Sequence, residues 1–238
     1  MGMGGEVTFF TNGLCPYAQR VALALAWKDI AHERVEIDLS NKPSWYRQRL
    51  GTSLVPAIEL DGQPVAESLD IVRLLDSRFP TAPLMPDDGR AVDVAELVSF
   101  CSTLESAGWA LLGGSWSFPT RGTSSQSGRS RWATAVGVLD ASISKHGGPF
   151  LVGSAPSVAD CAIAPFLARF ELAAERCSGF NARAESDALA RYLDHLEKDA
   201  GWCRTFPDRE LFGTAIERYG SLDYFDYHTA SLAQPLPD

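Results

Sequence analysis

The sequence has no long apolar run and an excess of negative over positive charge. No stretch reaches the roughly 18 apolar residues that a membrane-spanning helix needs. Residues 1–11 also lack the basic start and the apolar segment of a signal peptide. Lys and Arg number 21 against 30 Asp and Glu, which gives a formal net charge of −9. Because a surface of this sign repels phosphate backbones, we expect no nucleic-acid partner, and because no long apolar run is present, we expect no membrane partner.

Cysteines are few, and their spacing indicates no pairing. They are odd in number, lie far apart, and form neither a CxxC pair nor a zinc-ligand spacing. They are Cys15, Cys101, Cys161, Cys177 and Cys203. We therefore expect no metal site, a cytoplasmic or similarly reducing location, and thiols that are mostly free and buried.

Apolar residues, by contrast, are plentiful enough for a packed core. They make up 45% of the 238 residues, and this length suits one large domain or two modest ones. In the first eighty residues, strand and helix patterns alternate in the order βαβαββα, which predicts a small α/β unit with a mixed sheet. The expected strands are 6–10, 33–38, 56–60 and 64–66, and the expected helices are 16–27, 42–50 and 68–79.

A proline-rich stretch then interrupts these patterns. Pro80, Pro83 and Pro86 and the turn residues that follow them place a linker at 81–89. The two predicted domains are 1–80 and 90–238. Strand patterns nearly vanish in the second domain, which we expect to be all-helical. Its expected helices are 92–112, 129–145, 157–174 and 185–200, with an exposed connection at 113–128.

The sharpest chemical feature is Leu14-Cys15-Pro16-Tyr17, between an expected strand and an expected helix. Proline favours the first helical position, so Cys15 should lie at the N-cap or just before it, where the helix dipole and free amides stabilise an anion. A thiol there should have a lowered pKa, although a buried structural cysteine is the alternative. Because position 18 is Ala18, no second cysteine can close a disulfide, and an external thiol must resolve any intermediate.

Serine stands at two further helix starts. Ser157 and Asp160 fit a capping box at the head of an apolar run. Ser68, after Glu67, is either a simple N-cap or a residue whose hydroxyl and amide hold a carboxylate with help from the helix dipole. In the second case, Glu67 could hold a neighbouring ammonium.

Three motifs in the first domain, Cys15-Pro16-Tyr17, Val55-Pro56-Ala57 and Glu67-Ser68, resemble those of the glutathione transferase superfamily. The helical second half after a proline-rich linker is also similar, so the resemblance spans almost the whole chain. The cysteine indicates the cysteine-type branches, omega and lambda. Residues 38–46 look most like the plant lambda class, and omega and dehydroascorbate reductase-like proteins come next.

This resemblance implies a thioredoxin-like N-terminal domain that binds glutathione, followed by an all-helical domain that contributes the acceptor-substrate site. Cys15 would form a mixed disulfide with glutathione. Val55 would pair its backbone with the tripeptide, and the bond before Pro56 would be cis. Glu67 and Ser68 would hold the γ-glutamyl end. The implied glutathione site is Cys15, Pro16, Tyr17, Lys42, Val55, Pro56, Glu67 and Ser68.

Two parts of the implied site are less defined. Lambda sequences often carry a lysine just before the Val-Pro step, where this chain has Leu54. The cation for the glycyl carboxylate is therefore expected to be Lys42, or else Arg47, although an exposed Lys42 without a ligand is the alternative. The acceptor site would be lined by aromatic side chains, which at such spacing more often belong to the core. They are Trp109, Trp116 and Phe118.

The function implied by the resemblance is a glutathione-dependent thiol transferase that reduces mixed disulfides or removes glutathionyl groups. Dehydroascorbate reduction would use the same nucleophile. Its partners would be glutathione and glutathionylated or electrophilic small molecules, and the lambda class implies a monomer. Two alternatives stay open: conjugation of glutathione to electrophiles, with Tyr17 as a conceivable hydroxyl donor, and a non-catalytic binding protein for flavonoid-like aromatic ligands.

Overall fold

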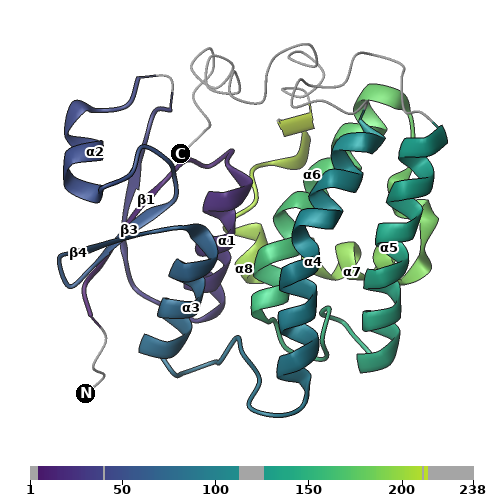
Figure 1. Cartoon of the computed structure of the whole chain (residues 1–238), viewed down its shortest axis with the longest axis horizontal. Helices are drawn as coiled ribbons and strands as arrows, with labels where there is room; N and C mark the ends of the chain where they lie inside the picture. Colours follow the sequence, from purple (N-terminus) through teal and green to yellow (C-terminus); the bar gives the residue numbers. More distant parts are fainter. Residues whose placement is uncertain (1–4, 40, 113–125, 211, 214–238) are drawn as a thin grey trace.

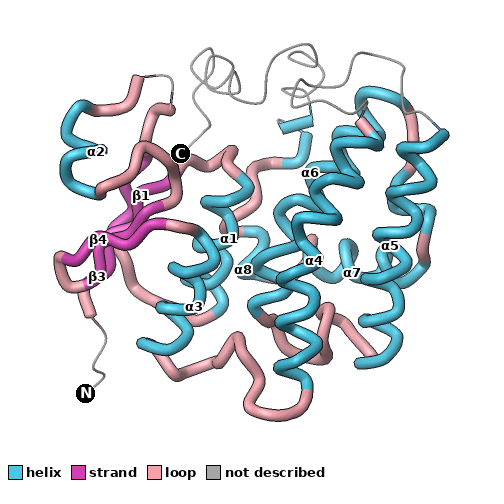
Figure 2. The backbone as a smooth tube through the Cα atoms, in the orientation of Figure 1, coloured by secondary structure: helices cyan, strands magenta, loops and turns pink. Residues whose placement is uncertain are grey.

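The computed structural model of the protein describes residues 5–39, 41–112, 126–210 and 212–213. Figure 1 shows a sheet with helices on both of its faces, beside a bundle of helices. Figure 2 shows the paired strands gathered in the part of the molecule built from the start of the chain. Within the described residues, no helix is long and apolar enough to cross a bilayer.

The first part of the chain has the predicted order βαβαββα. Its elements are β1 (Val7–Thr11), α1 (Pro16–Trp27), β2 (Glu33–Glu36), α2 (Ser44–Leu50), β3 (Ala57–Leu60), β4 (Gln63–Ala66) and α3 (Ser68–Arg78). The strands form one sheet in the order β2-β1-β3-β4. Because β1 is parallel to β2 and antiparallel to β3, the prediction of a mixed sheet is confirmed.

Helices cover both faces of this sheet, with α1 and α3 on one side and α2 on the other (Figure 1). Neighbouring residues of β1 supply the two cores, because successive side chains of a strand point to opposite faces. Phe9 belongs to the core shared with α1 and α3, whereas Phe10 packs with Tyr46 and Leu50 of α2. Because both faces of the sheet are covered, we expect a binding site in the loops at the ends of the strands.

The second part of the chain is helical where it is described, as predicted. Its elements are α4 (Arg90–Leu111), α5 (Gln126–His146), α6 (Val158–Ser178), the short 3-10 helix η1 (Ala182–Glu185), α7 (Asp187–Leu196) and α8 (Ala200–Cys203). Helix α6 is buried along most of its length and contacts α1, α3 and α4. Glycine at 108 permits the close approach of α4 and α6, because a Cβ on Gly108 would lie 2.3 Å from the ring of Phe170.

The helix expected at 185–200 is shorter than predicted: α7 spans Asp187–Leu196, and the two ends of the predicted range belong to η1 and α8. The hydroxyl of Ser186 accepts a hydrogen bond from the amide of Leu189 (3.1 Å) and begins α7. The carboxylate of Asp199 accepts from the amide of Trp202 (2.8 Å) and begins α8. An N-cap residue does not have the helical backbone conformation, so the helix is broken at each of these two residues. The apolar pattern alone did not indicate these breaks.

The predicted capping box is confirmed at the start of α6. One carboxylate oxygen of the fully buried Asp160 accepts from the amide (2.8 Å) and the hydroxyl (2.7 Å) of Ser157. The other oxygen accepts from the amide of Leu151 (3.0 Å) and the hydroxyl of Tyr192 (3.0 Å). Asp160 thereby joins α6 to the loop before it and to α7.

The segment between α3 and α4 is held by a buried lysine at the end of α1. Lys28 Nζ donates to the carboxylate of Asp76 (2.7 Å) and to the carbonyls of Thr81 (3.0 Å) and Ala82 (2.9 Å). The proline-rich stretch thus runs against α1 and α3. The domain limits 1–80, 81–89 and 90–238 themselves stay a prediction.

Candidate active site

Cys15 occupies the predicted place, the N-cap of α1, with Pro16 as the first helical residue. The turn before it is fixed by Asn12, whose carbonyl accepts from the amide of Cys15 (3.0 Å). The side chain of Asn12 accepts from the amide of Leu14 (3.1 Å) and donates to the carbonyl of Ile37 (3.1 Å) at the end of β2. The thiol is thus positioned by a rigid turn between β1 and α1.

The Val55-Pro56 step lies next to this thiol. Its peptide bond is cis, as the resemblance implied. Cys15 Sγ lies 3.9 Å from the carbonyl oxygen of Val55, and the hydroxyl of Tyr46 donates to the carbonyl of Leu54 (2.9 Å), which holds the loop on α2. The structure therefore brings together two motifs that are 40 residues apart in the sequence.

Glu67 and Ser68 stand at the start of α3. Glu67, not Ser68, is the N-cap residue, and its side chain makes no capping hydrogen bond. Of the two alternatives for Ser68, the simple N-cap is contradicted, because Ser68 is the first helical residue. Its buried hydroxyl accepts from Arg20 Nη1 (3.4 Å). Glu67 has φ 67° and ψ 110°, and a positive φ of this kind is rare for non-glycine residues and clusters at functional sites.

The two cations proposed for the glycyl carboxylate lie around α2. Lys42 Nζ donates to the carbonyl of Ser53 (2.8 Å), on the loop that leads to Val55. Arg47 lies on the exposed face of α2. Lys42 thus lies next to the Val55 loop, whereas the identity of the carboxylate-binding cation stays a prediction.

Tyr17 faces the helical domain. Its hydroxyl donates to Glu105 Oε2 on α4 (3.2 Å), and its ring lies edge-on to Phe166 of α6, with the ring centroids 4.9 Å apart. Burial, followed by the charge of Glu105, raises the pKa of Tyr17. Since a phenol has a single proton to donate, this hydroxyl is already engaged.

The expectation of a lowered pKa for Cys15 is wrong. Desolvation by the surrounding protein raises the pKa of this thiol above its ordinary value. The amides of Ala18 and Tyr17 and the charges of Arg169 and Arg20 act in the opposite direction, but they do not offset the loss of water. The sequence indicated the helix terminus, whereas the burial of the thiol depends on the two hydrophobic cores against which Cys15 packs.

We therefore expect Cys15 in the reduced, glutathione-free protein to be alkylated by iodoacetamide with an alkaline pH profile. Because the thiolate is the reactive form, a raised pKa leaves less of it at neutral pH than an ordinary thiol has. The rate, followed by peptide mass spectrometry, should reach half its maximum at a higher pH than the rate for N-acetylcysteine. A half-maximum below that of the reference thiol would contradict this expectation.

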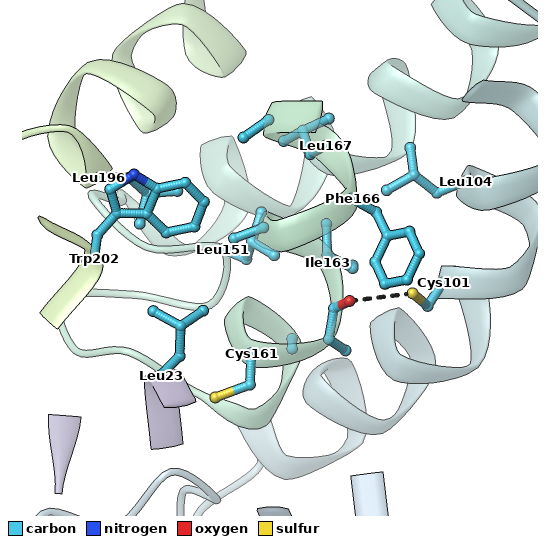
Figure 3. Packing of buried hydrophobic residues seen from close by; sticks show 14 of the residues in the cluster. Leu23, Cys101, Leu104, Leu151, Cys161, Ile163, Phe166, Leu167, Leu196 and Trp202 are labelled. Carbon is cyan, nitrogen blue, oxygen red and sulfur yellow. Dashed lines mark hydrogen bonds between the residues drawn. The ribbon is translucent and has the colours of Figure 1, made fainter. Parts of the chain in front are cut away.

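The other cysteines follow the prediction of buried thiols only in part. Cys101 and Cys161 are buried, and Figure 3 shows Cys101 directed at the carbonyl oxygen of Ala162 (3.3 Å) with Phe166 beside it. Burial raises the pKa of Cys101 to about 12. Cys203, however, is exposed, because it ends the one-turn helix α8, in which Trp202 is buried instead.

The residues predicted for the acceptor site are only partly described. Trp109 of α4 is half-buried and lies edge-on to Phe170, with the ring centroids 5.2 Å apart, so it packs against the core. Trp116 and Phe118 lie outside the described residues. A cavity of about 300 Å³ is lined by other residues, from α6, α7, α8 and the segment after them, among them Leu193, Trp202 and Phe206.

Two buried arginines near Cys15 were not found from the sequence. Arg20 Nη2 pairs with Glu105 Oε1 at 2.9 Å. Arg169 of α6 donates to the carbonyl of Leu14 (3.2 Å), directly before the nucleophile, and also to Gln19 of α1. Both arginines interrupt otherwise apolar helical patterns, and this was the only sign in the sequence that they could have a functional role.

Comparison with known proteins gives matches along most of the chain. Residues 10–83 match the family model "Glutathione S-transferase, N-terminal domain", and residues 122–195 match "Glutathione S-transferase, C-terminal domain". Glutathione S-transferase L3 of Arabidopsis thaliana is 28% identical over 209 residues, which cover 86% of this chain and 83% of that protein.

Solved structures with the same fold include two enzymes of other organisms. Glutathione transferase Omega 3C from Trametes versicolor has a TM-score of 0.76 at 25% identity and covers 90% of both chains. Dehydroascorbate reductase from Chlamydomonas reinhardtii has a TM-score of 0.71 at 24% identity and covers 90% of this chain and 98% of that one. At that identity, the second likeness concerns the fold alone.

Proposed function

Since this chain belongs to the glutathione S-transferase family, we propose that it is a glutathione-dependent thiol transferase with Cys15 as its nucleophile. The predicted fold, a thioredoxin-like domain followed by a helical domain, is confirmed, as is the resemblance to the lambda class. The activity of the relatives is the starting point of the proposal, and the site's own residues support it.

The observation that carries the proposal is the place of Cys15 Sγ, at the start of α1 and 3.9 Å from the backbone of Val55. A tripeptide paired with the Val55 backbone, as an added strand, would bring its own central cysteine to this thiol. The two sulfur atoms would then be placed to form a disulfide. An enzyme that conjugates glutathione must keep the thiol of bound glutathione free, and a cysteine at position 15 would instead form a disulfide with it.

The reaction has two balanced steps. The Cys15 thiolate attacks the glutathione sulfur of a mixed disulfide, a new sulfur–sulfur bond forms, and the other thiol leaves as a thiolate that takes up a proton. A second glutathione, as its thiolate, then attacks the Cys15–glutathione disulfide, which releases glutathione disulfide and restores Cys15. Ala18 stands where a resolving cysteine would be, so this second thiol must come from solution.

The raised pKa of Cys15 bears on this chemistry. A thiolate of higher pKa is less abundant at neutral pH but intrinsically more nucleophilic, so the two effects partly cancel in the rate of thiol exchange. Arg169 and Arg20 lie near enough to favour the thiolate. Dehydroascorbate reduction, in which two glutathiones supply the two electrons, is a companion activity of the same nucleophile.

The test of the proposal is the intermediate itself. Reduced protein is mixed with a glutathionylated peptide, quenched in acid and digested, and each cysteine peptide is analysed by mass spectrometry. We expect one glutathionyl group on Cys15, which added glutathione removes. An adduct on another cysteine, or turnover without any adduct, would contradict the mechanism, and ligand binding without turnover would favour a carrier of aromatic compounds.

Conjugation of glutathione to electrophiles is the weaker enzymatic alternative. It needs a hydroxyl that keeps bound glutathione as a thiolate, and Tyr17, the donor considered, already donates to Glu105 (3.2 Å). The cytoplasmic location, the monomeric state and the acceptor substrate stay predictions.

Replacing Ser68 with alanine should weaken glutathione binding more than it destabilises the fold. The proposed role of Ser68 is to donate to the γ-glutamyl carboxylate, and hydrogen bonds to charged groups contribute about 1.5–3 kcal/mol. Its hydroxyl is not an N-cap, and its bond to the charged Arg20 is long (3.4 Å) and therefore weak, so we expect unfolding to become easier by only about 1 kcal/mol. Calorimetric titration with glutathione and urea unfolding measure the two effects. Unchanged affinity would show that Ser68 is not part of the site.

A further inference from the structure

Arg20 is buried at the point where four helices meet. It lies in the second turn of α1, five residues after Cys15. Its Nε donates to the carbonyl of Ala162 on α6 (3.1 Å), its Nη2 to Glu105 on α4 (2.9 Å), and its Nη1 to the hydroxyl of Ser68 on α3 (3.4 Å). One guanidinium thus connects the helix of the nucleophile, the helix of Ser68 and two helices of the second domain.

Fold stability by itself gives no reason for a charged residue here. A buried ion pair stabilises a fold no better than well-packed apolar side chains of similar volume, because both charges lose their hydration. The side chains of Arg20 and Glu105 are only 6% and 18% exposed. What arginine does offer is a rigid, planar set of five donors, which can hold several acceptors in fixed relative positions.

The bond from Arg20 constrains the hydroxyl of Ser68. A serine hydroxyl has one proton to donate and two lone pairs with which to accept. Because Arg20 takes a lone pair, the proton of Ser68 must point away from the guanidinium. Ser68 is the first residue of α3, and the N-cap residue Glu67 makes no side-chain capping bond there. The hydroxyl proton and the free amides of the first turn can therefore serve the same anion.

We propose that Arg20 is a positioning residue for the γ-glutamyl carboxylate of glutathione: it acts through Ser68 and is itself held by Glu105. This inference rests on the proposed function, because it takes Ser68 as a glutathione contact. It makes the affinity of the α/β domain for the tripeptide depend on the helical domain, which supplies Glu105. Glu105 also accepts from Tyr17 (3.2 Å), so the same carboxylate anchors the first turn of α1.

A double-mutant cycle tests this role. Glutathione affinity is measured by calorimetry on the full-length, reduced protein for Arg20→Met, Ser68→Ala and the double variant. We expect each single substitution to raise Kd about tenfold. The double variant should bind no more weakly than Ser68→Ala, because Arg20 acts through that hydroxyl. Arg20→Lys, which keeps the charge without the fork, should lie between the parent and Arg20→Met, and it replaces Arg20→Met in the cycle if that variant does not fold.

Lys28→Met is the matched control. Lys28 is a second buried cation on α1, and it pairs with Asp76 (2.7 Å) at the far end of α3 from Ser68. We expect Lys28→Met to unfold at a lower temperature but to bind glutathione as the parent does. Additive losses in the cycle, or an equal loss of affinity in Lys28→Met, would overturn the inference.

The failure of the proposed function has a different signature. It is the absence of a glutathionyl adduct on Cys15 in the parent protein, which is measured without any Arg20 variant. A parent that binds no glutathione would overturn both proposals. A parent that forms the adduct but gives an additive cycle would overturn the role of Arg20 alone.

Discussion

Replacing Cys15 with serine is expected to abolish thiol transfer while the protein still folds and binds glutathione. Neither step can proceed without a sulfur at this position, because a serine hydroxyl cannot form the mixed disulfide. We expect the rate to fall by roughly three orders of magnitude or more, as happens when a covalent nucleophile is removed. The measurement is the formation of glutathione disulfide from a mixed disulfide of glutathione and mercaptoethanol.

Cys203→Ser is the matched control for this experiment. Cys203 is an exposed thiol at the end of α8, and its removal should leave transfer at the parental rate. The Cys15→Ser variant should also gain some conjugating activity, because its hydroxyl can donate to the thiolate of bound glutathione. Full thiol transfer by Cys15→Ser would overturn the proposed mechanism, whatever the fate of the conjugating activity.

Replacing Asp160 with alanine is expected to destabilise the protein by roughly 3–5 kcal/mol. The carboxylate accepts four hydrogen bonds in a fully buried place, from the amide and hydroxyl of Ser157, the amide of Leu151 and the hydroxyl of Tyr192. Alanine would leave these buried donors without an acceptor and would remove the cap of α6. Urea unfolding, followed by circular dichroism, measures the loss.

Two further variants separate this effect from the general effect of losing a charge. Asp187 lies exposed in the first turn of α7, so Asp187→Ala should change stability by no more than about 0.5 kcal/mol. Asp160→Asn keeps the shape and one acceptor oxygen and should lose less than Asp160→Ala. An Asp160→Ala variant as stable as Asp187→Ala would show that these four bonds contribute little.

The features predicted best from the sequence are those set by neighbouring residues. The helix at 16–27 was predicted with both of its ends, because Pro16 favours a helix start and the residues that follow are rich in Ala and Leu. The capping box at Ser157 and Asp160 is likewise a matter of four consecutive residues. The helix at 185–200 was predicted too long at both ends, because apolar periodicity continues through the caps that bound α7 and α8.

The properties of the site were predicted less well than its residues. The place of Cys15 at the start of α1 followed from its local sequence, but its pKa did not, because desolvation depends on what else packs over the thiol. The partners of Arg20 and Arg169 were missed for the same reason. Arg20 contacts Ala162, 142 positions away, and Arg169 contacts Leu14, 155 positions away, and no local pattern encodes these partners.

The sequence by itself determined the order of strands and helices in the first domain, the all-helical character of the described second domain, and the position of the Cys15 thiol at a helix start. These follow from local backbone preferences and apolar periodicity, which act over a few residues. Only the tertiary structure decided that Val55 and Cys15 are neighbours, that the thiol is desolvated, and that Tyr17 and Arg20 share Glu105. The physical reason is that burial and charge pairing are set by tertiary packing. The loop before β3 meets the start of α1, and side chains of α1 meet those of α4 and α6, although these segments lie far apart in the chain.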